Sequence, residues 1–327
     1  MKTGSGEERT SRLNALTLKD IREAHARIEP YIHRTPVFRC STIDEICEGK
    51  LFFKCENLQK AGAFKIRGAA NAIFSLSKTD AAKGVATHSS GNHAAALALA
   101  AGWRGIPAYV VMPENSPEVK KKAVAGYGAE IVFCKPTLEA REKGLAGVVD
   151  RTGAQFIHPY NDRRVIAGQG TAALELCEEI GGLDVVMAPV GGGGLLSGTA
   201  IAVSSISSNT LIVGAEPEKA DDAAQSLKLG RIVVPENPDT VADGLRTSLG
   251  TLTFSIIKKH VSDIVTVSEE DIIRAMRTIW ERMKLVVELS AAVPLGALLS
   301  GRKDFRGKRI GIILSGGNVD LERLPWI

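Results

Sequence analysis

A regular alternation of short apolar runs and longer helical segments is the feature that most constrains the fold of this chain. Apolar runs of strand length cover residues 51–55, 84–87, 108–112, 130–134, 185–188, 211–215, 264–267 and 310–314. Helical patterns cover residues 17–28, a segment after Asn92, and residues 118–125, 138–149, 167–180 and 269–283, with Thr17, Ser268 and Asp271 placed as caps. Strand, helix and strand repeated this often predict an α/β fold whose mostly parallel sheets carry helices on both faces.

These units are distributed unevenly along the chain, which suggests two domains. Three of them lie between Gly84 and about Tyr160, and the others lie outside that stretch. We therefore expect two open, mostly parallel twisted sheets flanked by helices. One belongs to a large domain formed by residues 1–76 and 161–327, and the other to a small inserted domain formed by residues 77–160. A chain of 327 residues is long enough for both.

Charge and hydrophobicity exclude several classes of protein. The 41 basic and 37 acidic residues give a net charge of only +4 and are interleaved, so we expect no nucleic-acid partner. No apolar stretch reaches the length of a membrane span, and the polar start is unlike a secretion signal. The five cysteines are scattered and contain no CxxC pair, which favours reduced thiols and a cytoplasmic protein.

Glycine-rich or polar turns follow three of the predicted strands, at the end of the strand where ligands bind in open parallel sheets. The first turn consists of Gly191, Gly192, Gly193 and Gly194, at the start of a predicted helix. Its amides can surround an anion without obstruction by side chains, so a phosphate fits it well. The turn lacks the lysine and hydroxyl of a nucleoside-triphosphate loop and the spacing of a dinucleotide loop. The alternative is a turn that is merely flexible.

The other two turns are rich in hydroxyl and amide groups. Residues 87–93 (THSSGNH) supply donors suited to a carboxylate, and the alternative is that Ser90 or Asn92 only caps the alanine-rich helix that follows. Residues 314–320 (LSGGNVD) place Ser315 where the chain turns sharply, which on its own is more often a simple turn.

Lys65 stands among small and apolar residues in the stretch AGAFKIRGAANA, residues 61–72. Desolvation in such surroundings disfavours the ammonium form, and a neutral amine condenses with a carbonyl group. A phosphate site, a carboxylate site and such an amine together predict pyridoxal phosphate as the cofactor. The alternative is that Lys65 begins a helix and extends into solvent.

Five motifs, in this order along the chain, resemble the fold-type-II pyridoxal-phosphate enzymes, which share the fold of the tryptophan synthase β subunit. The motifs are ENLQKAGAFKIRGAA at 56–70, SSGNHA at 89–94, HPYNDRRVIAGQGT at 158–171, GGGG at 191–194 and SGGNVD at 315–320. The resemblance runs from about Arg34 to Asp320. Within the family, the chain is most similar to the serine racemase and serine/threonine dehydratase group.

The resemblance implies a set of residues around the cofactor: Phe64, Lys65, Asn92, Gly191, Gly192, Gly193, Gly194, Gly244, Glu288, Ser315 and Gly316. Lys65 would form the internal Schiff base and then act as the base at Cα, while Phe64 would pack near the ring. Asn92 would hydrogen-bond the phenolic oxygen, and the glycines at 191–194 would hold the phosphate. Ser315 would face the pyridine nitrogen, which makes the ring a weaker electron sink and favours elimination over transamination.

The implied reaction is β-elimination, in which a hydroxy amino acid (serine, threonine or 3-hydroxyaspartate) is dehydrated to a 2-oxo acid and ammonia. The residues implied to bind the substrate are Ser89, Ser90, Asn92, His93, Arg141 and Thr247. Ser90 stands where dehydratases commonly carry alanine and racemases carry a serine on the ring face opposite the lysine, so racemase activity is also expected. Arg141 would pair with a second carboxylate, unless it is an ordinary exposed arginine of a helix.

The resemblance also implies a divalent metal and a homodimer. Glu216 and Asp222, with the carbonyl of Ala220, match the metal site of the racemases, and oxygen ligands of this kind suit Mg2+ or Ca2+. Without the resemblance, Asp222 would be interpreted as an acidic residue in the first turn of a helix. Ala61 replaces a threonine associated with nucleotide binding, which weakens the expectation of ATP activation.

Three other functions stay open on the sequence. The chain could be mainly a serine- or aspartate-type racemase, or a cysteine-synthase-like enzyme of β-replacement. The SGNH motif at residues 90–93 argues against β-replacement, because that group usually carries SGNTG. The third is a regulator that binds an amino acid without catalysis, and the presence of Lys65 counts against it.

Overall fold

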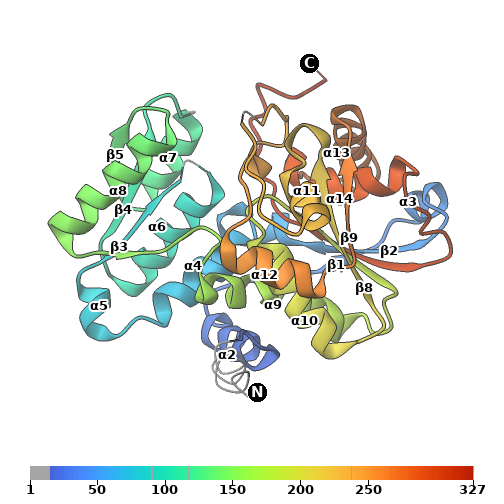
Figure 1. Cartoon of the computed structure of the whole chain (residues 1–327), viewed down its shortest axis with the longest axis horizontal. Helices are drawn as coiled ribbons and strands as arrows, with labels where there is room; N and C mark the ends of the chain where they lie inside the picture. Colours follow the sequence, from blue (N-terminus) through green and yellow to red (C-terminus); the bar gives the residue numbers. More distant parts are fainter. Residues whose placement is uncertain (1–14, 90, 117, 237, 327) are drawn as a thin grey trace, which may run out of the picture.

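The computed structural model describes residues 15–89, 91–116, 118–236 and 238–326 and contains two separate sheets (Figure 1). The larger sheet has the order β1-β2-β10-β7-β8-β9. Its strands are β1 (Val37–Phe38), β2 (Lys50–Cys55), β7 (Val185–Pro189), β8 (Leu211–Pro217), β9 (Asp263–Val267) and β10 (Arg309–Leu314). β1 runs antiparallel to β2, whereas the other pairings of this sheet are parallel.

The smaller sheet, on the left in Figure 1, has the order β5-β4-β3-β6 and is parallel throughout. Its strands are β3 (Val85–His88), β4 (Ala108–Pro113), β5 (Glu130–Cys134) and β6 (Gln155–Phe156). The predicted fold class, α/β with two mostly parallel sheets, is therefore confirmed. The division into residues 1–76 with 161–327 and residues 77–160 stays a prediction, and the strands of the smaller sheet all fall within the second range.

Each of the eight predicted strands is present, and the sequence missed β1 and β6. These two strands have only two residues each, so neither can show an apolar run or an alternating pattern.

Helices cover both sheets. They are α2 (Leu18–Ile28), α3 (Ser41–Ile46), α4 (Lys65–Phe74), α5 (Lys78–Ala82), α6 (Asn92–Arg104), α7 (Glu118–Gly126), α8 (Leu138–Thr152), α9 (Arg163–Glu179), α10 (Gly194–Ile206), α11 (Asp222–Leu229), α12 (Thr251–His260), α13 (Glu269–Met283) and α14 (Leu289–Leu299). Short 3-10 turns occur at η1 (Glu56–Leu58), η2 (Lys60–Gly62), η3 (Glu218–Ala220) and η4 (Asp243–Leu245). Within the described ranges, no helix has both the length and the apolar character that a membrane span requires.

The predicted caps are present at two helices. Thr17 and Asp20 form a capping box at α2, and Ser268 accepts a hydrogen bond from the amide of Asp271 at α13. α14 was not predicted, because it is apolar along its whole length and contains Pro294. A buried helix of this kind has no polar face from which a helical period can be recognised.

The large sheet is buried on both faces, as its strands show residue by residue. Along β10, Ile310, Ile312 and Leu314 belong to the core that contains α13 and α14. Ile313 points to the opposite core, which contains residues of α9 and α10. Because side chains alternate along a strand, a run of apolar residues such as β10 requires a helical layer on each side.

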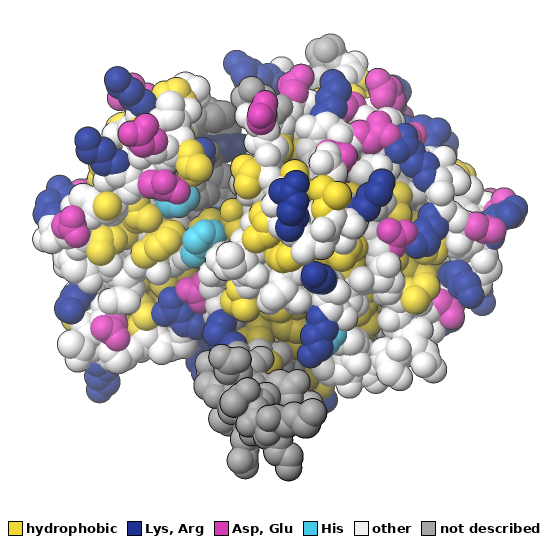
Figure 2. Space-filling model, viewed as in Figure 1, with side chains coloured by type: hydrophobic (Ala, Val, Ile, Leu, Met, Phe, Trp, Pro, Cys, Tyr) yellow, Lys and Arg dark blue, Asp and Glu magenta, His cyan; other side chains and the backbone are white. Residues whose placement is uncertain are grey.

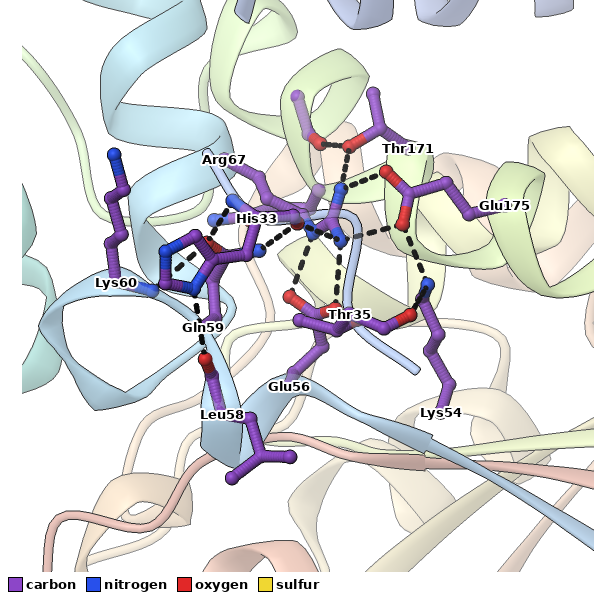
Figure 3. Close-up of polar contacts among 12 residues, drawn as sticks. His33, Thr35, Lys54, Glu56, Leu58, Gln59, Lys60, Arg67, Thr171 and Glu175 are labelled. Carbon is purple, nitrogen blue, oxygen red and sulfur yellow. Dashed lines mark hydrogen bonds and ion pairs between the residues drawn. The ribbon is translucent and has the colours of Figure 1, made fainter. Parts of the chain in front are cut away.

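A buried cluster of charged groups fastens α4 to α9 and β2 (Figure 3). Arg67 of α4 donates hydrogen bonds to Glu56 at 2.7 and 2.8 Å and to Glu175 of α9 at 2.7 and 2.9 Å. Lys54 of β2 completes the cluster with a contact of 2.6 Å to Glu175. Two cations and two anions are therefore paired at full burial, and they hold in place the helix that begins at Lys65.

Candidate active site

Lys65 is the first residue of α4, and its side chain is partly buried, with its amine turned toward the protein. Its Nζ donates a hydrogen bond to the carbonyl oxygen of Pro159 at 3.2 Å and lies 5.1 Å from the centre of the Phe64 ring. Burial lowers the pKa of Lys65 to about 8, although the negative charge of Glu288 acts in the opposite direction. The desolvated amine predicted from the sequence is thus present in the structure.

The segment before Lys65 is tied to the turn that follows β10. The amide of Phe64 donates to the carbonyl of Ser315 at 3.0 Å, and the amide of Gly317 donates to the carbonyl of Gly62 at 2.9 Å. Ala63 and Gly316 form an isolated antiparallel bridge between these two bonds. Segments that are far apart in the sequence, and that were predicted separately, therefore form one wall of the site.

The glycines at 191–194 form a buried turn between β7 and α10 in which side chains do not fit. A Cβ on Gly192 would lie 2.3 Å from the Tyr160 ring, and one on Gly191 would lie 2.9 Å from the Cα of Leu245. Gly193 has a φ of 84°, in the left-handed region that glycine adopts without strain. No side chain caps α10, so the amides of its first turn remain for a ligand. Uncapped amides at a helix N-terminus fit the phosphate of pyridoxal phosphate.

Asn92 and Glu288 meet at the other side of the site. The Nδ2 of Asn92, the first residue of α6, lies 3.0 and 3.1 Å from the two carboxylate oxygens of Glu288, which precedes α14. Burial raises the pKa of Glu288 to about 7, and the hydrogen bond from Asn92 partly opposes this change. A Cβ on Gly316 would lie 2.7 Å from Oε1 of Glu288, so the carboxyl group packs against the turn after β10. The amide of Gly244 donates to Oγ of Ser290 nearby, at 3.1 Å.

The residues expected to hold the substrate carboxylate lie in unlike environments. Ser89 is partly buried, and its Oγ accepts a hydrogen bond from the amide of Gly91 at 3.4 Å. Ser90 lies outside the described residues, so its role stays a prediction. The ring of His93 is buried, with Nε2 3.2 Å from the carbonyl oxygen of Ile157. Its Nδ1 is buried and has no hydrogen-bond partner among the described residues.

Arg141 and Thr247 lie on different parts of the fold, Arg141 on α8 and Thr247 in the segment after η4. Arg141 lies in the first turn of α8 and is partly exposed, and its Nε donates to the carbonyl of Thr137 at 3.4 Å. Burial lowers the pKa of His88, and the charge of Arg141 lowers it further. Thr247 is exposed, and its Oγ1 would lie 3.3 Å from a Cβ on Gly191, so it adjoins the glycine turn. Figure 2 shows histidine side chains, in cyan, where the two lobes of the molecule meet.

Comparison with known proteins agrees with this geometry. A family model described as "Pyridoxal-phosphate dependent enzyme" matches residues 28–316. The chain belongs to this family. Lys65 and the glycine turn, derived above from the residues themselves, both lie within the matched range.

Three relatives are similar over nearly the whole chain. A β-hydroxyaspartate dehydratase of Paracoccus denitrificans is 52% identical, over 95% of this chain and 98% of the relative. An L-threo-3-hydroxyaspartate ammonia-lyase of Saccharomyces cerevisiae is 46% identical, over 94% of each. The crystal structure of a serine racemase from Dictyostelium discoideum is 52% identical, covers 94% of this chain and 99% of its own, and has a TM-score of 0.90. This chain is therefore an enzyme of the pyridoxal-phosphate-dependent group to which ammonia-lyases and racemases belong.

The residues expected to bind a metal form a buried acidic pair in this pyridoxal-phosphate-dependent enzyme. Glu216 accepts hydrogen bonds from the amides of Ala223 and Ala224, at 3.0 and 2.9 Å, whereas the buried oxygens of Asp222 have no hydrogen-bond partner among the described residues. The amides of Asp222 and Leu249 are close enough to lower the pKa of Asp222 in part, but burial raises it to about 7 overall. No three His, Cys, Asp or Glu side chains cluster in the described part of the chain. The expected set consists of two carboxylates, with the carbonyl of the buried Ala220 as the expected third ligand. Because all of these donors are oxygen atoms, they fit a divalent cation such as Mg2+ or Ca2+.

Residues 158–160 also contribute to the site, and the sequence assigned no role to them individually. The Tyr160 ring covers Gly192, as described above, and lies edge-to-face with the His158 ring at 4.6 Å between centres. Burial lowers the pKa of His158 to about 4. The motif HPYND was quoted only for its resemblance. Because β6, which precedes it, is two residues long, nothing marked this stretch as the carboxyl end of a strand.

Proposed function

We propose that this enzyme is a pyridoxal-phosphate-dependent ammonia-lyase that dehydrates a hydroxy amino acid, with 3-hydroxyaspartate as its main substrate. The observation that carries the proposal is the partly buried amine of Lys65, which donates to the carbonyl of Pro159 at 3.2 Å and whose pKa is lowered to about 8. A base whose pKa lies near the working pH suits the removal of a proton from Cα. The two hydroxyaspartate-cleaving relatives support the choice of substrate.

The residues around the cofactor would divide the work between them. Pyridoxal phosphate, when bound, withdraws electrons from the substrate Cα and so makes its proton removable. Gly191 to Gly194 would hold the phosphate, and Ser315 would face the pyridine nitrogen. Lys65 would take the Cα proton at Nζ. The hydroxyl would leave Cβ as water by taking a proton from the ammonium group formed at Nζ, and hydrolysis of the released enamine would give the 2-oxo acid and ammonia.

The substrate would lie between the start of α6 and Arg141. Ser89 and the backbone of His93 would bind the α-carboxylate. Arg141 would bind a second carboxylate, because a guanidinium group pairs with a carboxylate through two hydrogen bonds. The proposal is supported by the positive charge of Arg141, which lowers the pKa of His88 and opposes the effect of burial on the pKa of Tyr160.

Racemase activity is the second candidate. The observation that favours it is the similarity of this chain to the serine racemase from Dictyostelium discoideum. Inversion at Cα would need a proton carrier on the face opposite Lys65, and Ser90 is the residue proposed for that role.

We also propose that Glu216, Asp222 and the carbonyl of Ala220 bind Mg2+ or Ca2+, and that the enzyme is a cytoplasmic homodimer.

A substrate panel tests the proposed function. Purified holoenzyme would be assayed with L-serine, D-serine, L-threonine and each stereoisomer of 3-hydroxyaspartate, and both the 2-oxo acid and the amino acid enantiomers would be measured. We expect the highest kcat/KM for one isomer of 3-hydroxyaspartate. The variant Arg141→Ala should raise KM for that isomer at least tenfold and leave KM for L-serine nearly unchanged, since a lost charge-assisted bond costs about 1.5–3 kcal/mol. Absence of 2-oxo acid from every substrate would refute the proposal.

A further inference from the structure

Asn318 connects two parts of the active site through its side-chain amide. Its Nδ2 donates to the carbonyl oxygen of Ala61 at 2.8 Å and to Oδ1 of Asn92 at 3.0 Å. Both hydrogens of this NH2 group are then used. A Cβ on Gly62 would lie 2.3 Å from Oδ1 of Asn318, so the same side chain packs directly on the segment that leads to Lys65.

The amide of Asn92 is therefore restrained from both ends. Its Oδ1 accepts from Asn318, and its Nδ2 donates toward both oxygens of Glu288 at 3.0 and 3.1 Å. A rotation of the amide by 180° would place Oδ1 against the Glu288 carboxylate and would bring two NH2 groups together. Neither of these contacts is a hydrogen bond while Glu288 is ionised, because carboxylates only accept and NH2 groups only donate.

One N–H of Asn92 remains for a ligand. The two oxygens of Glu288 belong to one carboxylate and lie on the same side of Nδ2, so they share one hydrogen. The second hydrogen is directed elsewhere, and an asparagine amide in the opposite orientation would present an acceptor instead. The orientation of this amide thus decides whether the site offers a donor or an acceptor.

We propose that Asn318 and Glu288 are positioning residues that together fix the side-chain amide of Asn92, so that its free N–H faces the phenolic oxygen of the cofactor. This inference rests on the proposed function for the place of the cofactor. It assigns to Asn318, an exposed residue after β10, a role in cofactor binding that acts through Asn92 rather than through contact with the cofactor.

Because Asn318 and Glu288 both restrain the amide of Asn92, cofactor affinity should respond differently to single and double substitutions. With either Asn318 or Glu288 changed, the remaining partner still disfavours the wrong orientation, so the competent fraction of the protein stays high. With both changed, nothing selects the orientation, and the apparent dissociation constant rises as the competent fraction falls. The two substitutions should therefore act more than additively.

A double-mutant cycle tests the proposal. The apoenzymes of the wild type, Asn318→Ala, Glu288→Gln and the double variant would be titrated with pyridoxal phosphate by fluorescence quenching, and the visible spectrum of each holoenzyme would be recorded. We expect each single substitution to leave the cofactor Kd nearly unchanged. The double variant should raise it by about twofold, the limit for a two-state amide without a preferred orientation, and should shift the visible band.

Asn57 provides a matched control. Its Nδ2 donates to the carbonyl of Val286 at 3.1 Å, and it packs against Gly317, so it braces the segment before Glu288 and the turn before Asn318, and neither of these contacts involves Asn92. The cycle of Asn57→Ala with Asn318→Ala should be additive, and the visible band should stay in place. If the Glu288–Asn318 cycle is additive, or if the Asn57 cycle shows the same excess, the proposal is wrong. A wild type that binds the cofactor but turns over no hydroxy amino acid would refute the proposed function alone.

Discussion

The amine of Lys65 lies 3.2 Å from the carbonyl oxygen of Pro159, so the first residue of α4 contacts the loop between β6 and α9. This contact and the surrounding burial lead to a prediction about pH. The pKa of Lys65 is lowered to about 8, and only the neutral amine reacts with an aldehyde. The rate of covalent loading of the apoenzyme with pyridoxal phosphate should therefore increase about tenfold for each unit by which the pH rises toward 8, and it should level off above pH 8. Borohydride trapping at timed intervals measures the rate, and Lys65→Arg should give no trapped adduct. A rate that is independent of pH between 6 and 8 would contradict the assignment.

The glycine turn gives a prediction about space. Gly192→Ala adds a methyl group at a position 2.3 Å from the Tyr160 ring, so either the ring or the turn must move. We expect cofactor affinity to fall by at least tenfold, as measured by fluorescence titration. Gly147→Ala is the matched control, because a Cβ at this position in α8 meets no atom within 4 Å. That variant should keep the affinity and gain about 0.5–1 kcal/mol of stability from the better helix propensity of alanine. Equal affinities for the two variants would show that the turn does not bind the phosphate.

His93 gives a prediction about acid stability. Burial, together with the charge of Lys65, lowers its pKa to about 3 from an ordinary value of 6.5. Between these two pH values the unfolded chain binds a proton at this position that the folded protein does not bind. The free energy of unfolding should therefore decrease as the pH falls below 6.5, by about 1.4 kcal/mol per pH unit from this residue. Urea unfolding of wild type and His93→Gln at pH 7.5, 6 and 5 measures the change. The variant should show a smaller slope, and identical slopes would mean that His93 is protonated in the folded state.

The acidic pair of Glu216 and Asp222 gives a prediction about metals. Burial raises the pKa of Glu216 to about 9 and that of Asp222 to about 7, whereas a cation bound between them would keep both carboxyl groups ionised. Treatment with a chelator should lower the melting temperature by several degrees, and Mg2+ or Ca2+ should restore it. Asp222→Asn should abolish this response, because it removes one of the anionic ligands. A melting temperature that is the same with chelator and with added metal would rule out a structural ion at this position.

Much of the fold was predictable because its strands are buried on both faces. β8 contains the apolar run 211–215 and β10 the apolar run 310–314, and the turn Ser315-Gly316-Gly317 marks where β10 stops. β1 and β6 could not be predicted, because a two-residue strand exists only through its partner in the sheet. The sequence of α14 shows no helical period, because the helix is packed on every side and therefore has no polar face.

The candidate site was predictable to the extent that it lies in turns with unusual composition. Lys65 and Gly191 to Gly194 were found from local chemistry alone. The role of Asn318 was not, because it depends on a distance of 3.0 Å between residues 226 positions apart. For His93, the motif predicted the position of the residue but not the orientation of its side chain. The direction of the ring is set by the carbonyl of Ile157.

The position of β10 has a consequence for the growing polypeptide on the ribosome. β10 is the last strand of the described chain, yet it lies between β2 and β7. Until residues 309–314 have been synthesised, those two strands each lack a neighbour, and Ser315 and Gly316 are added later still. The wall that the turn after β10 forms with the segment before Lys65 therefore exists only after translation has passed residue 316, so assembly of this candidate active centre is a late event in the biogenesis of the enzyme.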